Sequence, residues 1–343
     1  MKFILVTGGL GFIGSHTVIE LLMNNYNVII IDNLINSSID VLQKIIKITN
    51  LNDKSRLQYY NIDVCNNFQL ENLFIKYKID SVIHFASLKA VGESKKKPLE
   101  YYYNNISGTI ALLQVMKKYD CKKIIFSSSA TVYGNNIYSV NEESKIGDGI
   151  TNPYGKTKYM LENILEDLYQ SDNSWSIVIL RYFNPIGAHP SGIIGENPND
   201  IPNNLFPYLL KVSVGQLEQL CIFGNDYNTI DGTCVRDFIH VVDLAKGHIL
   251  SLQKINNDPN NIYVYNLGTG KGTSVLELIN IFESVNNISL KYKFVQRREG
   301  DLSTVYANTE KAYKELGWKC QYTTEDMCRD GYNFIKNYNN IKN

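Results

Sequence analysis

Residues 2–14 read KFILVTGGLGFIG, and they decide the fold because a short apolar strand runs directly into a glycine-rich turn. The apolar run is Phe3 to Val6, and Gly9, Gly11 and Gly14 follow it at the start of an amphipathic helical pattern. Strand, glycines and helix in this order are the context that the dinucleotide-binding fingerprint requires. The glycines let the backbone approach a pyrophosphate, and the helix N-terminus supplies unpaired N–H groups and a positive dipole end.

A second strand pattern, residues 27–31, ends at an acid that fits an adenosine ribose. Asp32 lies 18 residues after Gly14, and a carboxylate there can hold the two ribose hydroxyls. Its charge would repel a 2′-phosphate, and no Lys or Arg follows until Lys44. We therefore predict NAD rather than NADP. The alternative is a strand-end carboxylate with a structural role alone.

Strand and helix patterns alternate as far as residue 184. We expect strands at 57–61, 81–85, 123–127 and 176–180, and helices at 68–77, 99–118 and from Tyr154 to about residue 169. This alternation predicts an α/β fold with a doubly wound, Rossmann-like parallel sheet. Ligands of such sheets lie at the C-terminal ends of the strands.

The alternation stops near Asn184, where five prolines fall within 23 residues, from Pro185 to Pro207. We expect an NAD-binding domain of residues 1–184 and a smaller C-terminal α+β substrate lobe of residues 185–343, with exchange of chain segments between them left open. The polar residues 337–343 are expected to form an irregular tail.

Tyr154 and Lys158 are four residues apart in the stretch PYGKTK, so they share one face of a helix. A free phenol has a pKa of about 10 and is a poor base at neutral pH, but a nearby ammonium lowers that value. The pair can thus serve as an acid–base couple. By itself the spacing also fits an ordinary surface helix.

Composition favours an ordinary enzyme of small molecules. Lys+Arg and Asp+Glu both number 34 in 343 residues, so no basic nucleic-acid face or anionic-membrane anchor is indicated. The N-terminal apolar run is too short for a signal peptide or a membrane span, and we expect a cytoplasmic protein. The six cysteines show no metal-binding spacing, so we expect reduced thiols and no metal. For His84, at a strand end, we expect a structural role.

Several longer blocks carry a resemblance to a known family. The chain resembles the extended short-chain dehydrogenase/reductases and, within them, the UDP-glucose 4-epimerases, over nearly its whole length. The glycine fingerprint and the Tyr154/Lys158 pair are typical of the superfamily, whereas other blocks are typical of the epimerases. These are LKAVGES from Leu88, RYFNPIGAHPSG from Arg181 and VRDFIHVVDLA from Val235. Further support for the resemblance comes from FSSSATVYG from Phe126, IPNNLFPYL from Ile201 and RREGDL from Arg297.

The resemblance implies an NAD-dependent isomerase that reversibly epimerises C4 of UDP-glucose and UDP-galactose through a 4-keto intermediate, with NAD tightly bound. Tyr154 would remove and return the 4-hydroxyl proton, Lys158 would lower the pKa of the phenol and hold the nicotinamide ribose, and Ser129 would bind the 4-oxygen. Arg236 and Arg298 can clamp the diphosphate as planar, charged donors.

The resemblance also implies the binding residues. For the cofactor they are Gly8, Gly11, Phe12, Ile13, Gly14, Asp32, Asn33, Asp63, Val64, Phe85, Ala86, Lys89, Asn104, Tyr154, Lys158 and Phe183. For the UDP-sugar they are Lys89, Ser129, Tyr154, Asn184, Asn204, Leu205, Cys221, Phe223, Arg236, Arg298, Asp301 and Val305.

Three other functions remain open. A nucleotide-sugar 4,6-dehydratase needs an acidic pair beside the catalytic Ser or Thr, where this chain has Ala130 and Thr131. A UDP-glucuronate decarboxylase would carry Glu in place of Thr131. A non-catalytic NAD-binding protein commonly lacks the tyrosine or lysine, and both are present here.

Two further expectations follow from the resemblance. The family pairs the helices expected at 99–118 and 154–169 with their copies in a homodimer, and the apolar side chains on more than one face include Ile110, Leu113, Met160, Leu161 and Leu165. Val305 stands where hexose-restricted relatives carry Tyr, so UDP-GlcNAc and UDP-GalNAc are candidate substrates; alternatively, Val305 is simply a core residue. Ser87 replaces a Gly common beside the cofactor.

Overall fold

The computed structural model describes residues 1–136, 138–198, 202–298 and 300–342. Ile201 and Glu299, which fall in two of the quoted blocks, lie outside these ranges. The helices are α1 (Phe12–Met23), α2 (Asp40–Thr49), α3 (Asn67–Lys76), α4 (Val91–Lys96), α5 (Pro98–Tyr102), α6 (Gly108–Lys118), α7 (Pro153–Ser171), α8 (Leu205–Ser213), α9 (Val241–Asn257), α10 (Val275–Asn286), α11 (Glu310–Leu316) and α12 (Thr324–Lys342), with short turns η1 (Lys54–Arg56), η2 (Tyr103–Ser107) and η3 (Ala130–Tyr133).

The strands are β1 (Phe3–Thr7), β2 (Val28–Ile31), β3 (Leu57–Tyr60), β4 (Ile79–His84), β5 (Lys123–Ser129), β6 (Tyr138–Val140), β7 (Ser176–Tyr182), β8 (Asn184–Ile186), β9 (Leu220–Phe223), β10 (Val235–Arg236), β11 (Phe238–His240), β12 (Ile262–Leu267), β13 (Thr273–Ser274), β14 (Tyr292–Val295) and β15 (Thr304–Ala307).

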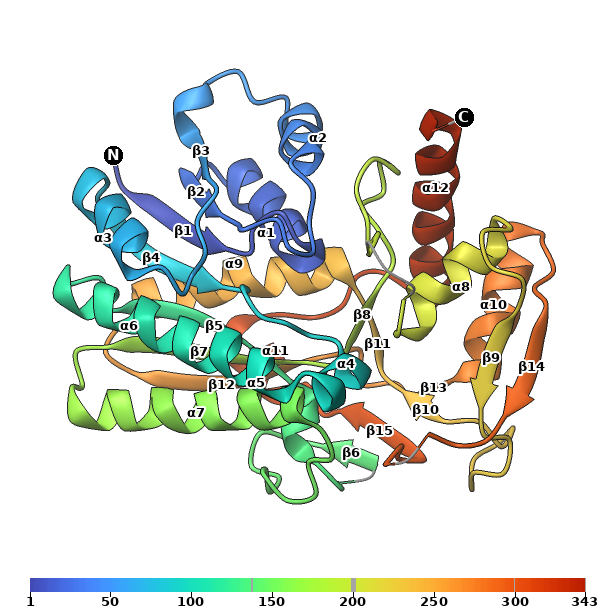
Figure 1. Cartoon of the computed structure of the whole chain (residues 1–343). Coiled ribbons are helices and arrows are strands. Elements are labelled where there is room, and N and C mark those ends of the chain that lie inside the picture. The colour runs from blue at the N-terminus through green and yellow to red at the C-terminus, as the bar shows by residue number, and fades with distance from the viewer. Residues whose placement is uncertain (137, 199–201, 299, 343) are drawn as a thin grey trace.

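The main sheet is parallel and has the order β12-β7-β5-β4-β1-β2-β3. Helices cover both of its faces, with α1, α2 and α9 on one side and α3, α6 and α7 on the other (Figure 1). The predicted doubly wound fold is confirmed. Its strands are buried on both faces, because Val6 packs with the first group of helices and Leu5 with the second.

The rest of the chain forms smaller sheets beside the main one. A four-stranded sheet has the order β13-β10-β15-β6, and β8 pairs with β11 and β9 with β14. Together with α8, α10 and α12 these strands make the second lobe at the right of Figure 1. No helix in the described part of the chain has the length and apolar character needed to cross a membrane.

A division strictly at residue 184 does not describe the main sheet. The chain leaves this sheet after β7, but α9 later packs against α1, and β12 extends the sheet beside β7. Residues 185–343 therefore contribute to both halves of the molecule. The reason is that an apolar pattern such as that of β12 indicates a strand but not the sheet that it joins.

Two expected elements differ from the observed ones. The helix expected at 99–118 is split into α5 and α6 by a π-helical turn, η2. The tail expected to be irregular belongs to α12, where the Asn337 amide donates to Gly192 O at 3.2 Å. A polar sequence thus stayed helical, because tertiary contacts hold it.

Candidate active site

The glycine turn between β1 and α1 leaves no room for side chains. Gly8 has φ +66°, and a Cβ there would lie 2.9 Å from Ala86 N, while a Cβ on Gly14 would overlap Gly8 O. Helix α1 follows Gly11 without a side-chain cap, so its first-turn N–H groups are free for a ligand. Such a turn fits a pyrophosphate against Phe12, Ile13 and Gly14.

Asp32 is buried at the end of β2 and fastens the loops around it. One carboxylate oxygen accepts from Leu10 N at 3.0 Å, and the other accepts from Leu34 N at 3.0 Å and Ser37 Oγ at 2.7 Å. The oxygen that accepts only from Leu10 N retains a lone pair that a ribose hydroxyl can use. The surroundings of Asp32 at the end of β2 therefore fit an adenosine ribose.

The neighbouring strand ends complete the same edge of the sheet. Asp63 accepts from the Asn33 amide at 3.0 Å and from Cys65 N at 2.8 Å, and Val64 beside it is buried. After β4, Ala86 N donates to Thr7 Oγ1, and the ring of Phe85 lies 4.8 Å from that of His248. Ser87 is half-buried and donates to Leu88 O. The structure thus brings Asn33, Asp63, Phe85 and Ala86 close to the glycine turn.

Lys89 forms an ion pair that the sequence did not indicate. Its ammonium lies 2.7 Å from the carboxylate of Glu196, which is buried, and 5.8 Å from the ring centroid of Phe12. Glu196 stands in the proline-rich stretch, where no pattern singles out one acid from another.

The π-helical turn η2 carries Asn104 and connects the loop after β4 to α7. The Asn104 amide donates to Asn105 Oδ1 at 3.0 Å, and Asn105 is buried. Asn105 bonds to both the N–H and the carbonyl of Leu88 and donates to Thr157 Oγ1. The wider turn gives Asn105 a route into the core, a feature common at functional sites.

Helix α7 places Tyr154 and Lys158 side by side at the end of β5. The helix begins with Asn152, whose side chain accepts from Gly155 N at 2.8 Å, followed by Pro153. The Lys158 ammonium lies 5.9 Å from the ring centroid of Tyr154 and donates to Ser127 O at 2.7 Å. Ser129 ends β5 and forms a hydrogen bond with Tyr154.

Burial is the largest influence on the pKa values of this pair. Burial raises the pKa of Tyr154, the Ser129 hydrogen bond opposes this, and Lys158 makes no resolved contribution to it. Burial also lowers the pKa of Lys158 to about 7, against the raising effect of Glu162. The ammonium is directed at the Ser127 carbonyl rather than at the phenol. The lowering of the phenol pKa by Lys158 therefore stays a prediction.

His84 has structural partners, as expected, and Ser128 also has one. His84 is buried between Thr7 Oγ1 at 2.7 Å and Thr109 Oγ1 at 2.8 Å. Burial lowers its pKa to about 3, so it is neutral. Ser128 donates to Glu162.

On the second lobe, two arginines contact other predicted substrate residues. The Arg298 guanidinium stacks 3.9 Å above the ring of Phe223 and donates to Asn203 O at 3.4 Å. Arg236 lies 3.4 Å from Asp301 in a partly exposed ion pair. The structure thus joins these predicted substrate residues in two pairs.

Asp237 is a buried carboxylate that the sequence analysis missed. It accepts from Thr269 N, Thr269 Oγ1, Gly270 N and Ala307 N at 2.6–3.1 Å. Its backbone carbonyl accepts from the N–H and the amide of Asn184. Asp237 therefore fixes β8 and β15, which carry Asn184 and Val305. The sequence feature that could have indicated Asp237 is its position directly after Arg236, a predicted substrate residue.

The remaining predicted residues lie on the same lobe or at its edge. Asn204 precedes α8 and Leu205 begins it, and Cys221 lies two residues before Phe223 on β9. Val305 is partly buried against a cluster that includes Phe183.

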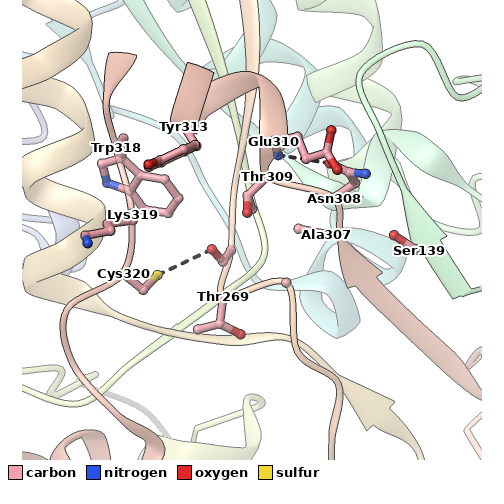
Figure 2. Close-up of a pocket in the computed structure, with 12 residues that line it drawn as sticks. Ser139, Thr269, Ala307, Asn308, Thr309, Glu310, Tyr313, Trp318, Lys319 and Cys320 are labelled. Carbon is pink, nitrogen blue, oxygen red and sulfur yellow. Dashed lines mark hydrogen bonds between the residues drawn. The ribbon is translucent and has the colours of Figure 1, made fainter. Parts of the chain in front are cut away.

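A cleft of about 500 Å³ lies elsewhere on this lobe (Figure 2). Thr269, Thr309, Trp318 and Lys319 line it, and Cys320 Sγ donates to Gly268 O at 3.3 Å. None of the predicted site residues lines this cleft, so it does not mark the catalytic centre.

The chain is similar to known proteins over nearly its full length. Residues 5–331 match the family described as GDP-mannose 4,6 dehydratase. The UDP-glucose 4-epimerase of Bacillus subtilis (strain 168) is 53% identical, over 96% of this chain and 95% of that protein. That of Dictyostelium discoideum is 51% identical, over 96% and 94%. This chain belongs to the UDP-glucose 4-epimerase family.

A solved epimerase shares the fold described above. The UDP-glucose 4-epimerase from Bifidobacterium longum, in complex with NAD+ and UDP, superimposes with a TM-score of 0.94 at 50% identity, covering 98% of this chain and 99% of that one. The family resemblance found in the sequence is confirmed, and the matching relatives favour an epimerase over the dehydratase for which the broader family is named.

Proposed function

We propose that this epimerase-family chain reversibly inverts C4 of UDP-glucose and UDP-galactose with tightly bound NAD. The observation that carries the proposal is the placement of Ser129, Tyr154 and Lys158 at the end of β5, on the edge of the sheet that also holds the glycine turn. The chain is thus an isomerase whose cofactor is regenerated in each cycle.

The residues of the first half fit NAD, as the glycine turn and the Asp32 carboxylate show. When bound, NAD would take the hydride from C4 of the sugar and return it, so the carbinol passes through a flat ketone. Lys158 would hold the nicotinamide ribose, and Lys89, Asn104 and Phe183 would border the cofactor.

Tyr154 would carry the proton of the sugar 4-hydroxyl. The phenol removes this proton as the hydride leaves and returns it when the hydride comes back. Ser129 would orient the 4-oxygen, and the charged Lys158 would favour the phenolate.

The second lobe would hold the nucleotide while the sugar turns. Arg298 and Arg236 would clamp the diphosphate, and the Phe223 ring that supports Arg298 would border the nucleotide. Because only the nucleotide is held firmly, the ketosugar can rotate, so that the hydride can return to either face of C4.

The rival reactions lack their residues. Ala130 and Thr131 sit on η3 directly after Ser129, where a dehydratase would use an acidic pair and a decarboxylase a Glu. The presence of both Tyr154 and Lys158 argues against a non-catalytic NAD-binding protein.

The proposal includes a homodimer. Leu99, Tyr103, Ile110 and Met160 are exposed on the adjacent elements α5, η2, α6 and α7, and such apolar side chains mark an interaction surface. Leu113, Leu161 and Leu165 instead pack against the main sheet, so they support the fold rather than the dimer. Light scattering at micromolar concentration should give a dimer mass, and a monomer would contradict it.

The substrate range includes UDP-GlcNAc and UDP-GalNAc in this proposal. Val305 is much smaller than Tyr and lies partly buried near Phe183, so a 2-acetamido group would have room. The domain roles are proposed likewise: residues 1–184 bind NAD, and residues 185–343 bind the UDP-sugar while also contributing α9 and β12 to the first half.

The decisive assay measures interconversion of UDP-glucose and UDP-galactose with no added NAD. Turnover without net NADH formation is expected, together with release of one dinucleotide on denaturation. Consumption of added NAD in proportion to product would instead identify a dehydrogenase.

A further inference from the structure

A buried ion pair joins α7 to β7 behind the candidate catalytic residues. The Arg181 guanidinium donates to both carboxylate oxygens of Glu162, with Nη2–Oε2 at 2.8 Å and Nε–Oε1 at 3.1 Å. Each side chain is only 5% exposed.

The pair extends into a network that spans five elements, α7, β7, β5, η3 and β12. Ser128 on β5 donates to Glu162, and Arg181 Nη1 donates to Tyr133 OH on η3 and to Glu142 O. Tyr133 OH in turn donates to Asn266 Oδ1 on β12. Breaking one member would leave buried polar groups without partners.

This network meets the catalytic residues at one strand end. Ser128 lies between Ser127, whose carbonyl accepts from Lys158, and Ser129, which bonds to Tyr154. Glu162 stands one helical turn after Lys158 on α7. One carboxylate therefore holds α7 against the strand end that carries Ser129.

We propose that Glu162 is a positioning residue for the epimerisation, which braces the end of β5 against α7 and keeps the Lys158 ammonium charged. This inference rests on the proposed function, because Lys158 matters through its charge beside Tyr154. Arg181 sets the strength of the effect by offsetting part of the carboxylate's charge.

The electrostatics around Lys158 support this role. Burial lowers the pKa of Lys158 to about 7, and Glu162 is the group that raises it. From β4, His84 faces the ammonium but is neutral, because burial lowers its pKa to about 3. Tyr182 on β7 and Tyr101 on α5 lie near Tyr154, and burial raises the pKa of both phenols. Glu162, which is paired with Arg181, is thus the charged side chain on α7 that raises the pKa of Lys158.

The test is the titration of Lys158 in the purified holoenzyme. Lysine labelled with ¹³C at Cε would be followed by NMR against pH, with Lys158→Met to assign the resonance. Glu162→Gln keeps the side-chain shape and removes the charge. It should lower the titration midpoint of Lys158 by about one pH unit, which is a tenfold change in the proton affinity.

Arg181→Met should shift the midpoint the opposite way, because the carboxylate charge is no longer offset. Glu162→Asp should restore most of the unaltered midpoint. The matched control is Glu166→Gln, an exposed carboxylate one turn further along α7, which should leave the midpoint unchanged. Shifts of opposite sign cannot come from general loosening of the fold.

Turnover gives a second readout. As pH rises through the pKa of Lys158, the ammonium is lost, so the alkaline limb of the kcat profile should move to lower pH in Glu162→Gln and to higher pH in Arg181→Met. KM should stay within about twofold, since neither residue is expected to touch the substrate.

An unmoved Lys158 midpoint in Glu162→Gln would overturn the inference. If Glu162→Gln does not fold, the opposite shift in Arg181→Met decides instead, and its absence overturns the inference equally. If the unaltered protein lacks epimerase activity, the proposed function fails, while the NMR titration still reports separately on the coupling between Glu162 and Lys158.

Discussion

The two sides of the candidate active site are built differently. The β5–α7 side is closed: Lys158 and Ser128 are buried, and both have hydrogen-bond partners within the protein. The second lobe offers Arg298, which is exposed, and Arg236, whose side chain is 21% exposed and pairs with Asp301 at 3.4 Å. Proton transfer needs fixed distances, whereas the arginines keep donors free for a charged ligand that covers them.

The largest effect is expected from the closed side. Tyr154→Phe removes the proton carrier and keeps the ring, so turnover should fall about 10²- to 10⁴-fold. Dinucleotide released on denaturation should be unchanged, because the ring packing remains. Near-normal activity of the Phe variant would contradict the role of Tyr154 as the proton carrier.

A change on the open side should act on binding instead. Arg298→Ala removes a charged donor and should raise KM about 10- to 100-fold, with kcat changed much less, because a hydrogen bond to a charged group contributes about 1.5–3 kcal/mol. The matched control is Arg297→Ala. The Arg297 guanidinium is engaged with Asp226 at 2.7 Å and stacks 4.0 Å from the Tyr227 ring.

Initial-rate kinetics on UDP-galactose would separate the two arginines. Equal KM values for the Arg298 and Arg297 variants would show that Arg298 is no diphosphate clamp. A fall in kcat alone would place Arg298 with the closed side.

The range of accepted substrates also tests the difference between the two sides, because Val305 lies at the edge of the second lobe. Val305→Tyr should lower turnover of UDP-GlcNAc relative to UDP-glucose by about tenfold or more, since bulk in a pocket discriminates at this level. Val305→Ala is the control and should keep or raise the ratio. An unchanged ratio in the Tyr variant, or no turnover of the acetamido sugar by the unaltered protein, would contradict the proposal.

The smallest effect concerns stability in acid, and it should arise in the closed half. Burial lowers the pKa of His84 to about 3 from its usual 6.5. The unfolded chain then binds more protons than the folded one below pH 6.5, so stability is lost as pH falls. Between pH 7 and 5.5 this group should cost about 1 kcal/mol.

Urea unfolding at both pH values would measure the difference. His84→Gln should reduce the loss of stability on acidification, whereas Arg298→Ala on the open side should leave it unchanged because Arg does not titrate there. An equal acid sensitivity in the His84 variant and the unaltered protein would remove this assignment.

Local patterns predicted much of the fold. The apolar runs before Gly8 and Asp32, and the spacing of Tyr154 and Lys158, act over a few residues, so strands, turn and helix follow from them directly. The family blocks then identified the epimerase relatives, which the comparisons confirmed. The predicted roles of the individual site residues remain proposals.

Most strands and helices, the nucleotide-binding turn and the family could be predicted from the sequence alone. The reason is that strand, helix and turn preferences depend on near neighbours along the chain. Three features became visible only in the folded protein: the pairing of β12 with β7, the hydrogen bond from the Lys158 ammonium to Ser127 O, and the contacts of Glu162 with Arg181 and Ser128. These contacts join residues that are between 19 and 85 positions apart in the sequence. They depend on burial and on the completion of hydrogen bonds in the core, which no local pattern contains.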